Sequence, residues 1–127
     1  MKTLLLSIAV MLTTIGLNAQ EKVLYSNVME TESGTIREYV SADPDTKMPL
    51  TKNTYIYDNN DVRLSKTSYN WDSQKGWIEY DKIEFHYIGS TPHSISYIKW
   101  DNQKQEWTNK QVYDVYMDSA ILYTIAY

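Results

Sequence analysis

Polar and apolar residues alternate with a period of two through most of the chain after Tyr25. This alternation is typical of β-strands that cover one face and expose the other. The clearest example is a strand predicted over residues 77–88. Its alternation assigns Trp77, Ile83, Phe85 and Tyr87 to one face and Lys82, Glu84 and His86 to the other, with Glu79 and Asp81 on the apolar face near the strand start.

The whole pattern predicts eight strands, because each alternating segment is bounded by residues that favour turns. Among the turn signals are Ser33-Gly34, Asp58-Asn59-Asn60-Asp61 and Lys75-Gly76. Short connections of this kind make neighbouring strands antiparallel. The predicted strands cover residues 22–29, 34–41, 50–58, 62–71, 77–88, 93–100, 107–117 and 120–127.

An internal repeat of about thirty residues runs through these strands. Trp77 matches Trp107, and the strand predicted over 107–117 repeats the pattern, with Tyr113, Val115 and Met117 on the face of Trp107. The preceding strands match at an offset of 29, because the second connection is one residue longer: Trp71-Asp72-Ser73-Gln74-Lys75 resembles Trp100-Asp101-Asn102-Gln103-Lys104. The repeats are placed at about 53–82, 83–112 and, partially, 113–127.

The sequence therefore predicts an all-β domain, built as an antiparallel meander of repeated hairpins in a single, strongly twisted or curled sheet. A twist of about −20 to −25° per strand pair prevents eight strands from staying flat. The alternative is a two-sheet β-sandwich. The chain has twelve Tyr and four Trp but one Phe, and we expect rows of Tyr and Trp on the concave, buried face.

The N-terminus has the pattern of a secretory signal peptide. Met1-Lys2-Thr3 supplies one positive charge, and a largely apolar run over 4–12 follows it. The run is shorter than the roughly 20 residues that a membrane-spanning helix needs. We expect residues 1–19 to be removed between Ala19 and Gln20, which leaves residues 20–127 as one periplasmic or secreted domain; an uncleaved N-terminal anchor is the alternative.

Charge and cysteine content narrow the classes of function. The chain has 12 basic and 16 acidic residues, and loss of Lys2 with the signal peptide leaves a net charge of about −5. A modestly acidic domain with interspersed charges is a poor partner for nucleic acid. The chain has no cysteine, so disulfides, thiolate catalysis and cysteine metal sites are excluded. We expect that the mature domain does not span a membrane.

Four tryptophans are the main candidates for a binding site. Trp71 and Trp77 flank one predicted connection, and Trp100 and Trp107 flank the equivalent connection one repeat later. Residues at the mouth of a hairpin face each other, so each pair can stabilise its hairpin across the strands. Alternatively, the rings form a stacking platform for sugars or the anchor of a protein interface. Their recurrence favours packing, because architecture repeats whereas a single site need not.

Candidate catalytic groups are few. His86 lies on the polar face of its strand and His93 follows Pro92 in a turn. We interpret both as surface residues, because neither belongs to a spaced set of nucleophile, base and orienting acid. Glu79 and Asp81 share a predicted face, and paired carboxylates can hydrolyse glycosides. A small secreted hydrolase that uses these carboxylates, or His86, is the alternative function.

The sequence predicts no metal or cofactor site. Two histidines without spaced partners fall short of the three or four ligands that zinc needs. The acidic turn Asp58-Asn59-Asn60-Asp61 lacks the ligand spacing and the closing glutamate of a calcium loop, so we interpret it as an ordinary turn. We therefore expect no catalytic residue, no metal and no cofactor.

The motifs of the repeat resemble a known family. They are Tyr57-Asp58 with Arg63 after a turn, Trp71-Asp72, Trp77, Tyr87, Trp100-Asp101 and Trp107. Together with the signal peptide, they are similar to the small exported proteins of Bacteroides-type bacteria grouped as domain of unknown function 3836. The resemblance covers most of the mature chain. It implies an exported repeat protein and supplies no catalytic residue.

Export, repeated hairpins with amphipathic aromatic residues and the lack of an assembled catalytic set together predict a non-catalytic binding or interaction module of the cell envelope. The expected partner is another envelope or secreted protein rather than a glycan stacked on Tyr and Trp. The last predicted strand, over 120–127, ends the sheet, and its open edge offers a place for self-association.

Overall fold

A computed structural model describes residues 13–15 and 22–114, and every regular element in this part of the chain is a β-strand. No helix among these residues has the length and apolar character needed to cross a membrane. The strands are β1 (Thr13–Ile15), β2 (Lys22–Thr31), β3 (Gly34–Ala42), β4 (Pro49–Asp58), β5 (Arg63–Asp72), β6 (Gly76–Ile88), β7 (Thr91–Asp101), β8 (Glu106–Trp107) and β9 (Gln111–Asp114).

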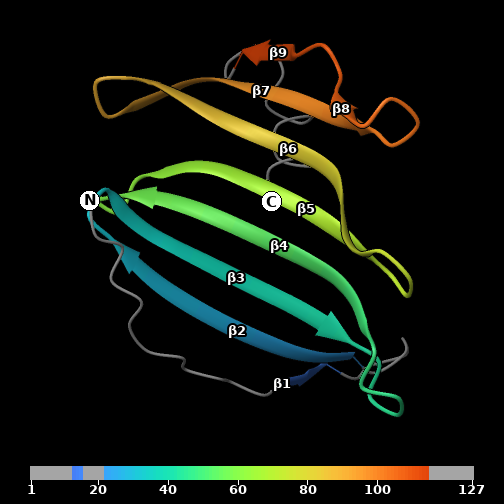
Figure 1. The fold of residues 1–127 in the computed structure, drawn as a ribbon. Coiled ribbons are helices and arrows are strands. Elements are labelled where there is room, and N and C mark those ends of the chain that lie inside the picture. Colours follow the sequence, from blue (N-terminus) through green and yellow to red (C-terminus); the bar gives the residue numbers. More distant parts are fainter. Residues whose placement is uncertain (1–12, 16–21, 115–127) are drawn as a thin grey trace.

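Each strand pairs antiparallel with the next one along the chain from β1 to β8, and β9 pairs with β7. Within the described residues no pairing joins β1 or β2 to β8 or β9, so the sheet is open (Figure 1). The predicted antiparallel meander in one sheet is confirmed, and the alternative two-sheet sandwich is not formed. The strand predicted over 120–127 lies outside the described residues.

The strand predicted over 107–117 is interrupted, and its described part forms β8 and β9 beside β7. Thr108, in the gap, keeps the two pieces in line with β7. Its backbone N–H donates to the Lys99 carbonyl at 2.8 Å, and its hydroxyl accepts the Lys99 N–H at 3.1 Å. A side-chain hydroxyl therefore continues the ladder across the break.

Four β-bulges interrupt the pairing of the long strands. Each leaves one residue without a partner in the ladder concerned: Leu50 in β4, Leu64 in β5, Tyr80 in β6 and His93 in β7. Leu50 and Tyr80 are 30 residues apart, and Leu64 and His93 are 29 apart, so the bulges follow the sequence repeat. A bulge bends its strand and increases the local twist. The curled shape of the sheet, with β6 bending near the β5–β6 turn (Figure 1), follows from these recurring bulges.

The pairing divides the side chains between two faces, which we name after marker residues. The arginine face carries Arg37 and Arg63. It also holds a small core, in which Ile83 and Ile95 are 2% and 3% exposed and pack with Phe85, Tyr97 and Tyr113. The opposite face, the tryptophan face, carries Trp71, Trp77, Trp100 and Trp107.

The prediction that Trp77 shares a face with Ile83 and Phe85 is wrong. The bulge at Tyr80 adds one residue to β6 and reverses the alternation, so Trp77 lies on the tryptophan face and the other two on the arginine face. Trp107 and Tyr113 are separated in the same way by the break in their strand. The Tyr and Trp rows are therefore divided between both faces instead of lining one. Val115 and Met117 lie outside the described residues.

Three turns at one end of the sheet share the same pattern of aspartate–backbone hydrogen bonds. Asp43, Asp72 and Asp101 follow one another at intervals of 29 residues. The Oδ1 atom of each accepts two backbone N–H groups of its own turn, at 2.9–3.0 Å. These bonds lower the pKa of Asp43 and Asp72, because backbone donors stabilise the charged carboxylate. The hairpin connections thus repeat in geometry as well as in sequence.

Candidate functional site

The structure places the two tryptophan pairs in nearly identical positions. Trp71 lies opposite Trp77, and Trp100 lies opposite Trp107. In both pairs the ring centroids are 5.1 Å apart, with interplanar angles of 73° and 74°, which is an edge-to-face contact. All four side chains are half-buried. Each ring therefore already has an aromatic partner within its own hairpin.

A lysine contacts the second tryptophan of each pair. The Nζ of Lys52 lies 4.5 Å from the ring centre of Tyr69 and 5.0 Å from that of Trp77. One repeat later, the Nζ of Lys82 lies 4.8 Å from the ring centre of Trp107. Such cation–π contacts add about 0.5–1 kcal/mol at exposed positions. Their recurrence at the same offset shows that these groups belong to the repeating architecture.

The two candidate carboxylates do not share a face. Glu79 pairs with Tyr69, whereas Asp81 pairs with the adjacent residue Ser68, because the bulge at Tyr80 lies between them. Adjacent residues of a strand point to opposite faces, so the prediction that Glu79 and Asp81 lie together is wrong. The pair needed for the glycosidase hypothesis is therefore not assembled.

Asp81 instead belongs to a polar contact on the arginine face. Its Oδ2 accepts a hydrogen bond from the Tyr97 hydroxyl at 2.9 Å. Burial of Tyr97 and this bond to Asp81 raise the pKa of the phenol, because both oppose its ionisation. The hydroxyl therefore remains a donor at neutral pH.

In the described part of the chain, His86 contacts a serine that is buried, and His93 lies at a bulge. His86 is exposed, and its Nε2 lies 2.7 Å from the Oγ of Ser96. A nucleophilic serine must be accessible to its substrate. Ser96 is only 3% exposed, and it pairs with Glu84 in the regular part of the β6–β7 ladder. His93 is exposed at its bulge. No group of three His, Cys, Asp or Glu side chains within the described ranges is placed to hold a metal ion.

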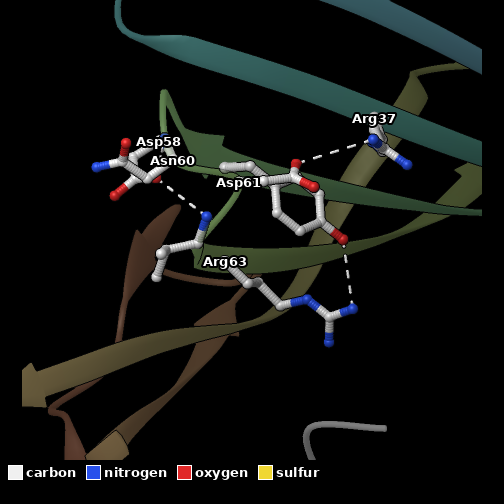
Figure 2. A network of polar contacts seen from close by, with 7 residues as sticks. Arg37, Asp58, Asn60, Asp61 and Arg63 are labelled. Atoms are coloured by element: carbon white, nitrogen blue, oxygen red, sulfur yellow. Dashed lines mark hydrogen bonds and ion pairs between the residues drawn. The ribbon is translucent and has the colours of Figure 1, made fainter. Parts of the chain in front are cut away.

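The acidic turn between β4 and β5 uses its first carboxylate internally. The Oδ1 of Asp58 accepts the backbone N–H groups of Asn60 at 2.8 Å and Val62 at 3.0 Å (Figure 2). Asp61 has a φ of 63°, a left-handed conformation that aspartate tolerates in turns. These contacts support the interpretation of the segment as an ordinary turn.

Beside this turn, the arginine face carries a cluster of cations and aromatic rings that the sequence did not reveal. The Cζ of Arg63 lies 4.8 Å from the ring centre of Tyr55, 5.7 Å from that of Tyr57 and 5.8 Å from that of Phe85. The Cζ of Arg37 lies 5.3 Å from the Tyr57 ring centre. Burial raises the pKa of Tyr55, so its ring stays neutral beneath the cations.

Hydrogen bonds and an ion pair fix the same cluster. The guanidinium of Arg63 donates to the Tyr57 hydroxyl at 3.3 Å, and the Arg63 carbonyl accepts the Tyr87 hydroxyl at 2.7 Å. Figure 2 shows Asp61 reaching toward Arg37, with 3.9 Å between the charged atoms. We call Arg37, Tyr55, Tyr57, Arg63 and Lys66 the cationic cluster; the Nζ of Lys66 lies 5.9 Å from the Tyr55 ring centre.

A second ion pair connects β6 to the gap between β8 and β9. The Nζ of Lys110 lies 2.7 Å from the Oε1 of Glu84 and lowers the pKa of that carboxyl from its ordinary value of 4.5. A carboxyl with a lowered folded-state pKa contributes stability above the unfolded-state pKa, and this contribution is lost as pH falls through the folded-state pKa. Glu84 and Lys110 side chains are 30% and 57% exposed, so the contribution is small.

We expect that Lys110→Gln lowers the free energy of unfolding by about 0.5 kcal/mol at neutral pH and by nearly nothing in acid, where Glu84 is protonated in both variants. Denaturant titrations over that pH range measure the difference. Lys104→Gln removes an exposed lysine from the neighbouring turn and is the matched control. Equal losses at neutral and acid pH would contradict the assignment to Glu84.

The fold and its two faces define the chain as an open antiparallel meander of repeated hairpins, with aromatic residues on both faces. The chain belongs to DUF3836, a family of unknown function whose model matches residues 1–118. None of the curated proteins matches the chain.

Two crystal structures of DUF3836 family proteins have a similar fold. One, from Bacteroides vulgatus ATCC 8482, is 22% identical, with 72% of this chain and 98% of that chain covered and a TM-score of 0.51. The other, from Parabacteroides distasonis ATCC 8503, is 14% identical, with 79% and 97% covered and a TM-score of 0.53. At these identities the likeness concerns the fold alone.

Proposed function

We propose that the chain is an exported, non-catalytic protein-binding module of the cell envelope. The observation that carries this proposal is the cationic cluster on one face of an open sheet. Tyrosine and arginine are enriched where proteins bind one another, because they combine a large contact area with directional hydrogen bonds. Here they lie together, half-buried, across β3, β4 and β5.

The separation of Glu79 from Asp81 supports binding over hydrolysis, because the two carboxylates that the hydrolase hypothesis pairs lie on opposite faces of the sheet. The tryptophan pairs give limited support to glycan binding, since each ring is already engaged by its partner across the hairpin. A protein partner is therefore the favoured ligand class.

Export is the second part of the proposal and rests on the sequence of residues 1–19. β1 lies within this segment and pairs with Lys22, Val23 and Leu24 of β2. Its removal would leave β2 as an edge strand, and an open edge can accept a strand from a neighbour. Self-association through this edge is thus a further consequence of export.

Co-purification from the envelope of the producing bacterium tests the proposal. We expect a tagged chain to be recovered from the periplasm or the medium, to begin at Gln20, and to retain a protein that untagged mature domain displaces in competition. A chain that keeps Met1 and sediments with membranes would contradict export. Turnover of a substrate that is abolished by Glu79→Gln, in a variant that still folds, would refute the non-catalytic assignment. Binding to a glycan array without recovery of a protein partner would show that the ligand is a glycan instead of a protein.

A further inference from the structure

The charges of the two sheet faces are distributed unequally across β3, β4 and β5. On the arginine face, residues 35–41, 51–57 and 63–70 place the cations Arg37, Arg63 and Lys66 and no acidic side chain. On the tryptophan face the same strands place Glu38 with its Oε2 3.9 Å from the Nζ of Lys52. The cationic cluster is thus a local excess of positive charge in a chain whose net charge is −4.

The acids of the arginine face lie outside the cationic cluster, on β2, at the end of β5 and on β6. Glu30 is on β2, and the Asp72 carboxylate accepts backbone hydrogen bonds within its own turn. Asp81, on β6, accepts a hydrogen bond from the hydroxyl of Tyr97 on β7. Asp61 approaches Arg37 from the β4–β5 turn, but its side chain is 75% exposed and the 3.9 Å separation is long for a hydrogen-bonded pair. The Arg37 side chain, 40% exposed, therefore remains accessible to a second carboxylate.

The aromatic rings hold these cations in place before any ligand arrives. Tyr57 contacts both guanidinium groups, and Tyr55 contacts Arg63 and Lys66. A guanidinium that is already ordered loses less conformational entropy when it binds, and its planar fork matches the two oxygens of a carboxylate. The rings between the cations also provide apolar contact area.

We propose that the cationic cluster binds an acidic, extended segment of the partner protein. This inference rests on the proposed function, because it names the partner chemistry of that same surface. β3 and β5 are two strand spacings apart, roughly 9–10 Å, which an extended segment with several carboxylates spans. Charges interact over a Debye length of about 8 Å, so a short acidic segment is attracted mainly by the nearby cations of the cluster. A long polyanion would also be repelled by the net negative charge of the chain.

A short synthetic peptide in which glutamate alternates with leucine is the probe, and the same peptide with glutamine in place of glutamate is its control. We expect the glutamate peptide to bind the purified chain, with affinity falling as salt rises, and to shift amide resonances of β3–β5. Arg37→Gln should weaken binding by about tenfold, and Arg37→Lys should restore part of the loss. Lys52→Gln, on the tryptophan face, removes a cation with similar ring contacts and should change affinity less than about twofold.

Three outcomes would overturn the inference: equal losses for Arg37→Gln and Lys52→Gln, equal binding of the two peptides, or preferential binding of anionic vesicles or an acidic polysaccharide. Resonance spectra of each variant establish that the fold is intact. If an envelope protein is retained equally by the native chain and by Arg37→Gln, the docking surface is wrong while the binding function stands. If no protein is retained at all, the proposed function itself fails.

Discussion

Replacement of Gly34 by alanine is expected to lower the free energy of unfolding by about 3 kcal/mol or more. Gly34 begins β3 with a φ of 153°, and a Cβ atom there would collide with the backbone oxygen of Tyr57. This neighbour is part of the β4 backbone, so it cannot rotate away as a side chain would. Either β4 moves away from β3 or the end of the hairpin opens.

Gly89 provides the control for Gly34. It also has a positive φ, of 62°, but nothing lies within 4 Å of the position that a Cβ atom would occupy. Gly89→Ala should therefore cost about 1 kcal/mol, the strain of a left-handed alanine alone. Denaturant unfolding of the two variants separates the clash from the strain. Equal losses of unfolding free energy in the two variants would show that the β4 backbone does not block a Cβ atom at Gly34.

Trp77→Ala is expected to lower the free energy of unfolding by about 2–3 kcal/mol, somewhat less than for a fully buried aromatic residue. Trp77 is half-buried and loses both its edge-to-face contact with Trp71 and its contact with Lys52. If the rings instead served only as a ligand platform, thermal and chemical unfolding would hardly change. Melts of the purified variants decide between these roles.

Two further variants sharpen the test. Trp71→Phe keeps a ring against Trp77 and removes an indole N–H that is buried without a hydrogen-bond partner in the described part of the chain, so its effect should be small. Tyr80→Ala removes an aromatic ring that is 49% exposed, and we expect a loss below about 1 kcal/mol. A loss at Tyr80 as large as that at Trp77 would contradict the packing role of the tryptophan pair.

The strands β2–β7, their order and their antiparallel pairing could be predicted from the alternation and the turn residues, because both are local properties of the sequence. β1 and the break between β8 and β9 were not predicted. The assignment of side chains to faces could not. A bulge adds one residue without interrupting the run of strand-forming residues, so Tyr80 looks like any other position of β6. The errors over Trp77 with Ile83, and over Glu79 with Asp81, both come from this single residue.

The cationic cluster was missed because it joins residues that no short motif connects. Arg37 and Arg63 come from different hairpins and meet through Tyr57, which lies on the strand between them. One signal was available: Tyr57 and Arg63 both belong to the family-like motif, and Tyr57 pairs with Arg63 directly across the β4–β5 hairpin. The tryptophan pairs were placed correctly opposite each other, since the length of a hairpin connection determines which residues face each other at its mouth.

The open meander makes this protein a one-dimensional array. From β2 to β7 each strand pairs with its two sequence neighbours, so the chain can lose order from either end without first disturbing the middle. The rates of amide hydrogen exchange should accordingly increase in steps from β4 toward both ends of the sheet, instead of all reporting one global unfolding transition. The surface spanning β3–β5 lies several strands from β8 and β9, and it would retain its shape while that end of the sheet opens and closes.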